Sequence, residues 1–234
     1  MWHKKNLSVG LCVLAILFTA CAQYPVINQS QLAITKELNN NDKIGLTATD
    51  LQTRAQQLKG FQSGDLIFKS SSSVYWILPD LDKMNLDLIA HEEQFSSSEY
   101  QARLDRVSRL HEEYLVFAVH LIMPFYSGWH QRQLYDYLEN NLVITLENGN
   151  GGRVNPETEI YQTNERFINS NRTNETLEVL VSLRCIFKKN YNEQSFISAK
   201  TRKLTLKVRL RKNPPFRIGF FDEKYYQGFV WKLK

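Results

Sequence analysis

Two His-Glu-Glu sequences are the residues of this chain that come nearest to a metal-binding pattern. They are His91-Glu92-Glu93 and His111-Glu112-Glu113. Imidazole and carboxylate groups are good zinc ligands, but a zinc protease helix needs a second histidine four residues after the first. Neither sequence has one, and His120 and His130 do not supply it. We therefore predict no metal and no other cofactor.

Other catalytic patterns do not appear in the chain. It has no serine nucleophile elbow, no phosphate-binding loop and no dinucleotide fingerprint. Acidic residues such as Asp80, Asp82 and Asp87 are plentiful, but their spacing singles out no catalytic pair. The sequence therefore favours a protein that is not an enzyme. The alternative is a hydrolase whose active-site residues are dispersed along the chain.

The most basic stretch lies between Lys200 and Lys212 and contains no acidic residue. Strand alternation would place four of its cations on one outward face, and the neighbouring strands would add further ones. A face of this kind suits contact with anionic headgroups, while the alternative is a solvated face that protects an edge strand from aggregation. The four candidate contact residues are Lys203, Lys207, Arg209 and Arg211, and the added cations would be Arg184, Lys188, Lys232 and Lys234.

The N-terminus has the features of an export signal. A short basic start with Lys4 and Lys5 precedes an apolar run over 11–20, which is too short to span a bilayer. The run ends in Phe18-Thr19-Ala20-Cys21, which resembles the lipobox of bacterial lipoproteins, although that family prefers Leu at the position of Phe18. The resemblance covers residues 1–22. It implies cleavage before Cys21, a diacylglycerol on its sulfur and anchoring in the cell envelope.

A second cleavage site competes with this one. Ala20-Cys21-Ala22 is also a good secretory exit, with cleavage before Gln23 and loss of Cys21. The protein would then be secreted or periplasmic, and an uncleaved anchor is a third alternative. If Cys21 is lipidated, Ala22 occupies the position at which some bacteria place an Asp that retains lipoproteins in the inner membrane. We therefore expect the periplasmic face of the outer membrane.

Cysteine content and charge restrict the remaining possibilities. Apart from Cys12 and Cys21 near the N-terminus, the chain has only Cys185, so a hydrophobic core and not disulfides must hold the fold. Cys185 lies in an apolar alternation typical of a buried thiol. The net charge of +5 falls to +3 without Lys4 and Lys5, since no acid lies in residues 1–20. That value and the export signal argue against nucleic acid as a partner.

Helical signals concentrate in the first half of the chain. A helix is expected from Asp50 to Lys59, with Thr49 as N-cap and Gly60 in the left-handed position after it. A stronger helix follows the N-caps at 96–98, since Tyr100, Leu104, Val107 and Leu110 recur at helical spacing. Between these helices we expect short strands at 65–69 and 73–78, the second closed by Pro79.

Period-two alternation dominates after Tyr114. One apolar face on each strand, with turn signals between strands, favours an antiparallel sheet that packs on one side. We predict an α+β protein with a signal peptide at 1–20, a helix-rich part at 21–113 and an antiparallel β-sandwich at 114–234, Ig-like in architecture only. Expected strands lie at 114–123 (stopped by Pro124), 142–146, 177–187, 204–210, 216–221 and 228–233, and a short helix or loop lies at 128–140.

The sequence thus predicts a membrane-anchored envelope lipoprotein that acts as a non-catalytic binding or assembly module. Its partners would be the membrane, through a lipid on Cys21, together with another envelope protein or anionic headgroups.

Overall fold

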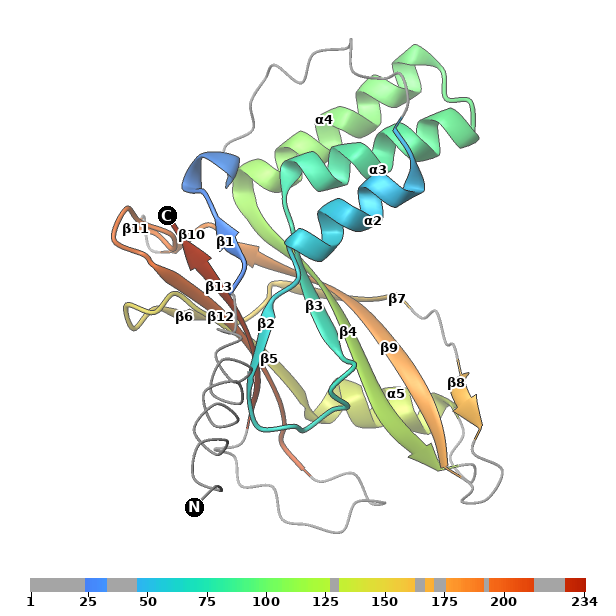
Figure 1. Cartoon of the computed structure of the whole chain (residues 1–234), viewed down its shortest axis with the longest axis vertical. Helices are drawn as coiled ribbons and strands as arrows, with labels where there is room; N and C mark the ends of the chain where they lie inside the picture. Colours follow the sequence, from blue (N-terminus) through green and yellow to red (C-terminus); the bar gives the residue numbers. More distant parts are fainter. Residues whose placement is uncertain are drawn as a thin grey trace, which may run out of the picture.

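The computed structural model describes residues 24–32, 46–126, 131–162, 167–170, 176–191, 194–212 and 226–234. Two large sheets and a group of helices make up this part of the chain (Figure 1). Cys21, the cleavage sites and the expected strand at 216–221 lie outside the described residues.

The first sheet, sheet A, has the order β1-β13-β12-β5-β6, and β2 also pairs with β13. Most of its pairs are antiparallel, but β1 runs parallel to β13. We expected antiparallel strands within 114–234 and no strand at 26–27, because a two-residue strand carries no readable alternation. The strands are β1 (Val26–Ile27), β2 (Phe61–Gly64), β5 (Leu142–Glu147), β6 (Arg153–Val154), β12 (Lys203–Leu210) and β13 (Gln227–Leu233).

The second sheet, sheet B, is antiparallel and has the order β3-β4-β9-β7, with β8 also on β9. Its central pair is unusually long, because β4 and β9 are joined residue by residue from Tyr114↔Lys188 to Tyr126↔Thr176. Pro124 therefore does not stop β4, contrary to our expectation, but lies within it opposite Glu178. The strands are β3 (Ser73–Ile77), β4 (Tyr114–Tyr126), β7 (Thr158–Gln162), β8 (Phe167–Ser170) and β9 (Thr176–Lys188).

Three helices, α2 (Ala48–Gln57), α3 (Pro79–Glu92) and α4 (Ser97–Glu113), lie side by side over one end of sheet B (Figure 1). Helix α2 begins two residues earlier than expected, because Thr47 and Asp50 form a capping box. Ser96 caps α4, as predicted. Helix α3 was not expected from the sequence, because Pro79 does not merely end a strand but occupies the first helical turn, where its missing N–H costs nothing. The short elements are η1 (Gln29–Leu32), α5 (Gln131–Asn141), β10 (Asn190–Tyr191) and β11 (Gln194–Ser195).

Aromatic side chains from the two sheets meet in the core. Trp231 of sheet A lies 5.3 Å from Phe117 and 6.1 Å from Trp76 of sheet B, measured between ring centroids. The Trp231 indole N–H donates to the backbone oxygen of Leu58 at 2.9 Å. All four residues are almost completely buried. Burial of such large rings contributes strongly to the stability of this core.

The segment from Leu58 to Gly64 connects the two sheets. The Gly60 N–H donates to Val74 in β3, whereas Phe61–Gly64 pairs with β13 as β2. The strand expected at 65–69 therefore lies earlier in the chain. Gly60 is also not a left-handed helix cap. Glycine is needed here because the backbone of residue 60 lies close to the Trp231 ring, and a Cβ at this position would lie 2.7 Å from that ring.

The predicted α+β class is confirmed, with helices, one mixed sheet and one antiparallel sheet. Strands β1, β2 and β3, from the first half of the chain, are built into the two sheets beside strands of the second half. None of the helices in the described part of the chain is long and apolar enough to cross a membrane.

Candidate functional site

An open groove lies on the outer face of sheet A, at the end where β1, β13 and β12 meet. It has a volume of about 550 Å³. Four of its eight lining residues are cations, and no Asp or Glu side chain is among the described residues that line it. The residues of this basic groove are Tyr24, Val26, Arg202, Lys203, Val230, Lys232, Leu233 and Lys234.

Strand register explains why these cations gather. Lys203 of β12 lies directly opposite Lys232 of β13, and Val26 of β1 lies on the other side of Lys232. Their neighbours Leu204, Trp231 and Leu233 are buried, so alternation turns the two lysines and Val26 outward. The three side chains form one row across the sheet.

The floor of the basic groove is apolar and aromatic. Val26 is one of the few large apolar side chains that are exposed in the described part of the chain, at 45%. The Tyr24 ring is held between the Phe61 ring, 4.7 Å away between centroids, and the Lys232 ammonium, 4.7 Å from its centroid. A cation above an aromatic face is attracted by the ring quadrupole. The groove therefore combines positive charge with an apolar and aromatic surface.

The cations predicted from sequence do not form one patch. Lys203 lies in the basic groove, whereas Arg211 follows the opposite end of β12, where its N–H donates to Asn141. Eight residues of extended strand separate them by roughly 26 Å. Lys207 lies between them and is bound to Glu147 at 2.8 Å and stacked over the Tyr226 ring at 4.1 Å.

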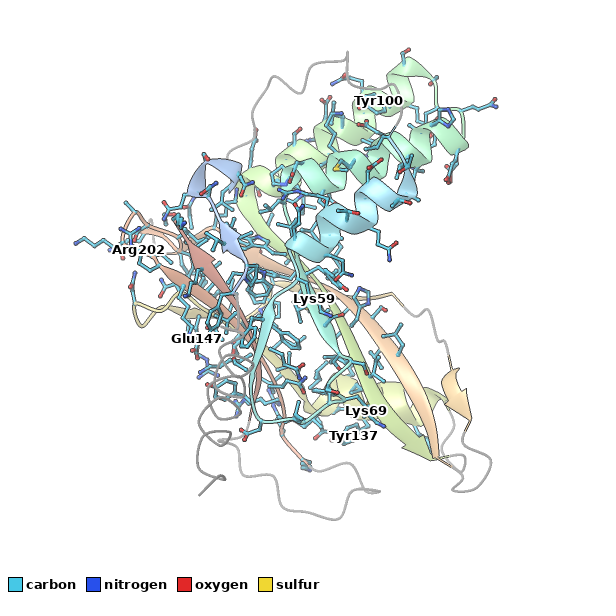
Figure 2. The ribbon with its side chains drawn as sticks, in the orientation of Figure 1. Lys59, Lys69, Tyr100, Tyr137, Glu147 and Arg202 are labelled. Carbon is cyan, nitrogen blue, oxygen red and sulfur yellow. The ribbon has the colours of Figure 1, made fainter. Side chains whose placement is uncertain are left out.

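Arg209, also on the outward face of β12, is half-buried. Figure 2 shows Arg202 near the end of sheet A beside β1 and Glu147 farther along the sheet. Among the described residues, none of the four groove cations forms an ion pair, whereas Glu147 is engaged by Lys207. Four cations without an ion pair in the described part of the chain therefore gather in the groove, and Lys232 and Lys234 are two of them.

Arg184 and Lys188, the other two added cations, are placed differently. Both belong to β9 of sheet B and pair with acids: Arg184 with Asp82 at 2.7 Å, and Lys188 with Glu157 at 2.5 Å. The pairing with Glu157 raises the pKa of Lys188. Neither residue adds to the basic groove.

The acids and one histidine singled out from sequence hold the helices together. Asp82 in α3 accepts from the ring of His111 at 2.8 Å and from Arg184 at 2.7 Å, which ties α3 to α4 and to sheet B. Asp80 pairs with Arg54 of α2, and Asp87 accepts from Tyr100 of α4. These contacts give the acids structural roles. Within the described ranges, no group of three or more His, Cys, Asp or Glu residues could hold a metal ion.

His120 and Ser182 form a pair on the outer face of sheet B. The His120 Nδ1 lies 3.0 Å from the Ser182 hydroxyl, and the Tyr75 ring packs against the imidazole. Burial lowers the pKa of His120, which favours the neutral ring. A neutral imidazole beside a hydroxyl could act as a base, but the described residues place no carboxylate within hydrogen-bonding distance of it to orient the ring.

Lys189 lines a second, smaller pocket of about 240 Å³. Its ammonium donates to the backbone oxygen of His111, in the last turn of α4, and to that of Leu32 at 3.4 Å. Burial lowers the pKa of Lys189. The amine is therefore used to close the helix end and to hold η1 in place.

Comparison of the chain with protein-family models, with curated proteins and with solved structures found no significant match.

Proposed function

We propose that this chain is a lipid-anchored protein of the bacterial cell envelope and that its folded part is a non-catalytic binding or assembly module. The anchor would be a diacylglycerol on Cys21, at the periplasmic face of the outer membrane. Stable attachment needs two or more acyl chains, which a diacylglycerol supplies.

The observation that carries this proposal is that residues 25–29, which follow Cys21 closely in sequence, are fixed to β13. Pro25 accepts the Lys232 N–H at 2.9 Å, Ile27 accepts the Lys234 N–H at 3.1 Å, and the Gln29 N–H donates to Lys234 at 3.0 Å. The chain is thus fixed to β13 from Pro25 onward. Tyr24 is three positions after Cys21, a span of at most about 11 Å. A lipid on Cys21 would hold the edge of sheet A close to the bilayer.

We further propose that sheets A and B of this module form a β-sandwich. The contacts of Trp231 with Phe117 and Trp76 place side chains of both sheets in one core. Such a scaffold presents its loops, edges and outer faces to partners. Another envelope protein or anionic headgroups are the partners that we propose.

Labelling and fractionation of the full chain test the anchor. Cells producing wild-type protein or Cys21→Ser are fed labelled palmitate, and the membranes are extracted with detergent. The proposal expects label and membrane association only in the wild type. If both chains are unlabelled and soluble, cleavage before Gln23 is the better account.

A hydrolase is the second candidate, and the pair formed by His120 and Ser182 is the observation that favours it. A fluorophosphonate probe distinguishes the two proposals, because it labels a serine that a neighbouring base activates. The binding module predicts no labelling of Ser182. Labelling that is lost in both Ser182→Ala and His120→Gln would instead establish an enzyme.

A further inference from the structure

Two like charges face each other in the basic groove. Lys203 and Lys232 are directly paired across β12 and β13, both are exposed, and neither has an acidic partner among the described residues. Like charges directly opposite on neighbouring strands destabilise a sheet. Arg202 and Lys234 add two more cations to the same groove. An arrangement that costs stability in the isolated protein favours a role in which an anion lies between the cations.

Glu147 shows that the sheet could have neutralised this charge. It lies opposite Thr205 in β12, so Lys203 and Lys207 are its two diagonal neighbours. Its carboxylate binds Lys207 and not Lys203. The acid thus neutralises the middle of the strand, and the end beside β1 keeps its positive charge.

The apolar floor narrows the class of anion. Val26 is exposed beside Lys232, and the Tyr24 ring packs under the same ammonium. Tyrosine rings and aliphatic side chains next to lysines are typical of surfaces that lie at the membrane interface, where one end of a side chain is apolar and the other is wet. A small inorganic anion would gain nothing from Val26, because it has no apolar surface to bury.

We infer that the basic groove binds the phosphate-bearing headgroups of anionic lipids, with Lys203, Lys232, Lys234 and Arg202 on the phosphates and with Tyr24 and Val26 at the acyl boundary. This inference rests on the proposed anchor for its location, since Cys21 is three positions before Tyr24. The lipid and the groove would together turn the outer face of sheet A, at its β1 end, toward the membrane.

Vesicle binding of the full chain carrying Cys21→Ser tests the groove without any lipid on the protein. Binding is measured on vesicles of phosphatidylcholine alone and on vesicles that also contain phosphatidylglycerol. The ratio of the two affinities isolates the anionic contribution from any apolar partitioning of residues 1–20, which is common to both. The inference expects a preference for anionic vesicles that weakens at high salt.

Charge variants of equal size locate the effect. Lys203→Gln, Lys232→Gln and Lys234→Gln together should lower the anionic preference by roughly 100-fold. The matched control replaces the exposed cations Lys59, Arg106 and Arg109 by Gln and should change the preference little. Arginine at the three groove positions keeps the charge and should keep binding, and circular dichroism checks that all variants are folded.

The outcomes separate this inference from the anchor. Equal losses of anionic preference in the groove and control variants, or no anionic preference at all, would overturn the inference that the groove binds headgroups. Inorganic phosphate should displace the chain no better than chloride at the same ionic strength, and selective displacement would overturn the lipid assignment in favour of a soluble ligand. Because the tested chain carries no lipid, these results do not depend on palmitate labelling of the wild type.

Discussion

Lys203 and Lys232 lie directly opposite each other on the antiparallel strands β12 and β13, with Val26 beside Lys232 on β1. Two residues farther along β12, Thr205 lies opposite Glu147, whose carboxylate is bound to Lys207 at 2.8 Å. One outward face therefore has an unneutralised end and a neutralised middle. The unneutralised end is also the end nearest to Cys21 in sequence.

Substitution of Lys203 and substitution of Lys207 should change the free energy of unfolding in opposite directions. Lys203→Gln relieves repulsion with Lys232 and should raise the free energy of unfolding by about 0.2–1 kcal/mol at low salt. Lys207→Gln removes the pair with Glu147 and the contact with Tyr226, and should lower it by about 0.5–1 kcal/mol. Urea denaturation measures both. High salt should shrink both effects, and destabilisation by Lys203→Gln would show that repulsion is not significant.

Asp82 should contribute more to the free energy of unfolding than its neighbour Asp80. Asp82 accepts from the buried His111 and from Arg184, and its own side chain is only 12% exposed. Asp82→Asn should lower the free energy of unfolding by about 1.5–3 kcal/mol. Asp80 is 39% exposed and pairs with Arg54, so Asp80→Asn should cost no more than about 1 kcal/mol. Equal losses would mean that burial of the Asp82 contacts adds nothing.

Gly60→Ala should destabilise the core. Its Cβ would lie 2.7 Å from the Trp231 ring and 2.9 Å from Phe229, so one of them must shift. We expect a loss of about 1–3 kcal/mol in the free energy of unfolding. Trp231→Phe removes the part of the ring that is too close, so the double variant should lose less than the sum of the single losses. Strict additivity would show that Trp231 is not the obstacle.

His120 should make the protein less stable in mild acid. Burial lowers its pKa below the ordinary value of 6.5, so the unfolded chain binds the proton more readily than the folded chain. Stability therefore falls as the pH drops through 6.5 toward the lowered pKa. The chain has other histidines, so the measurement is the difference between wild type and His120→Gln in urea denaturation at several pH values. A difference that does not change with pH would contradict the shift.

Local patterns made much of the fold predictable. The cap at Ser96 with helical spacing after it predicted α4, and clean alternation predicted β9 and β12. Helix α3 was missed because Pro79 follows a strand closely and is compatible with either a strand end or a first helical turn. Tertiary contacts decide between a strand end and a helical turn. Helix α3 is held by contacts of Asp80, Asp82 and Asp87 with residues distant in the chain.

The basic groove was only partly predictable, for a similar reason. Alternation correctly turned Lys203 outward, but whether a lysine is neutralised depends on the strand beside it. The pairing of Glu147 with Lys207 and the parallel pairing of Val26 with Lys232 both depend on strand register, which no local pattern in this sequence specifies. Arg202 and Tyr24 also line the groove, and no local pattern identifies them because their positions depend on the same strand pairing.

The N-terminal residue of the mature protein is the most direct test of the anchor. Intact-mass and peptide mass spectrometry of protein purified from membranes should find Cys21 as the first residue, carrying a diacylglycerol on its sulfur. An unmodified chain beginning at Gln23 would contradict the lipid anchor.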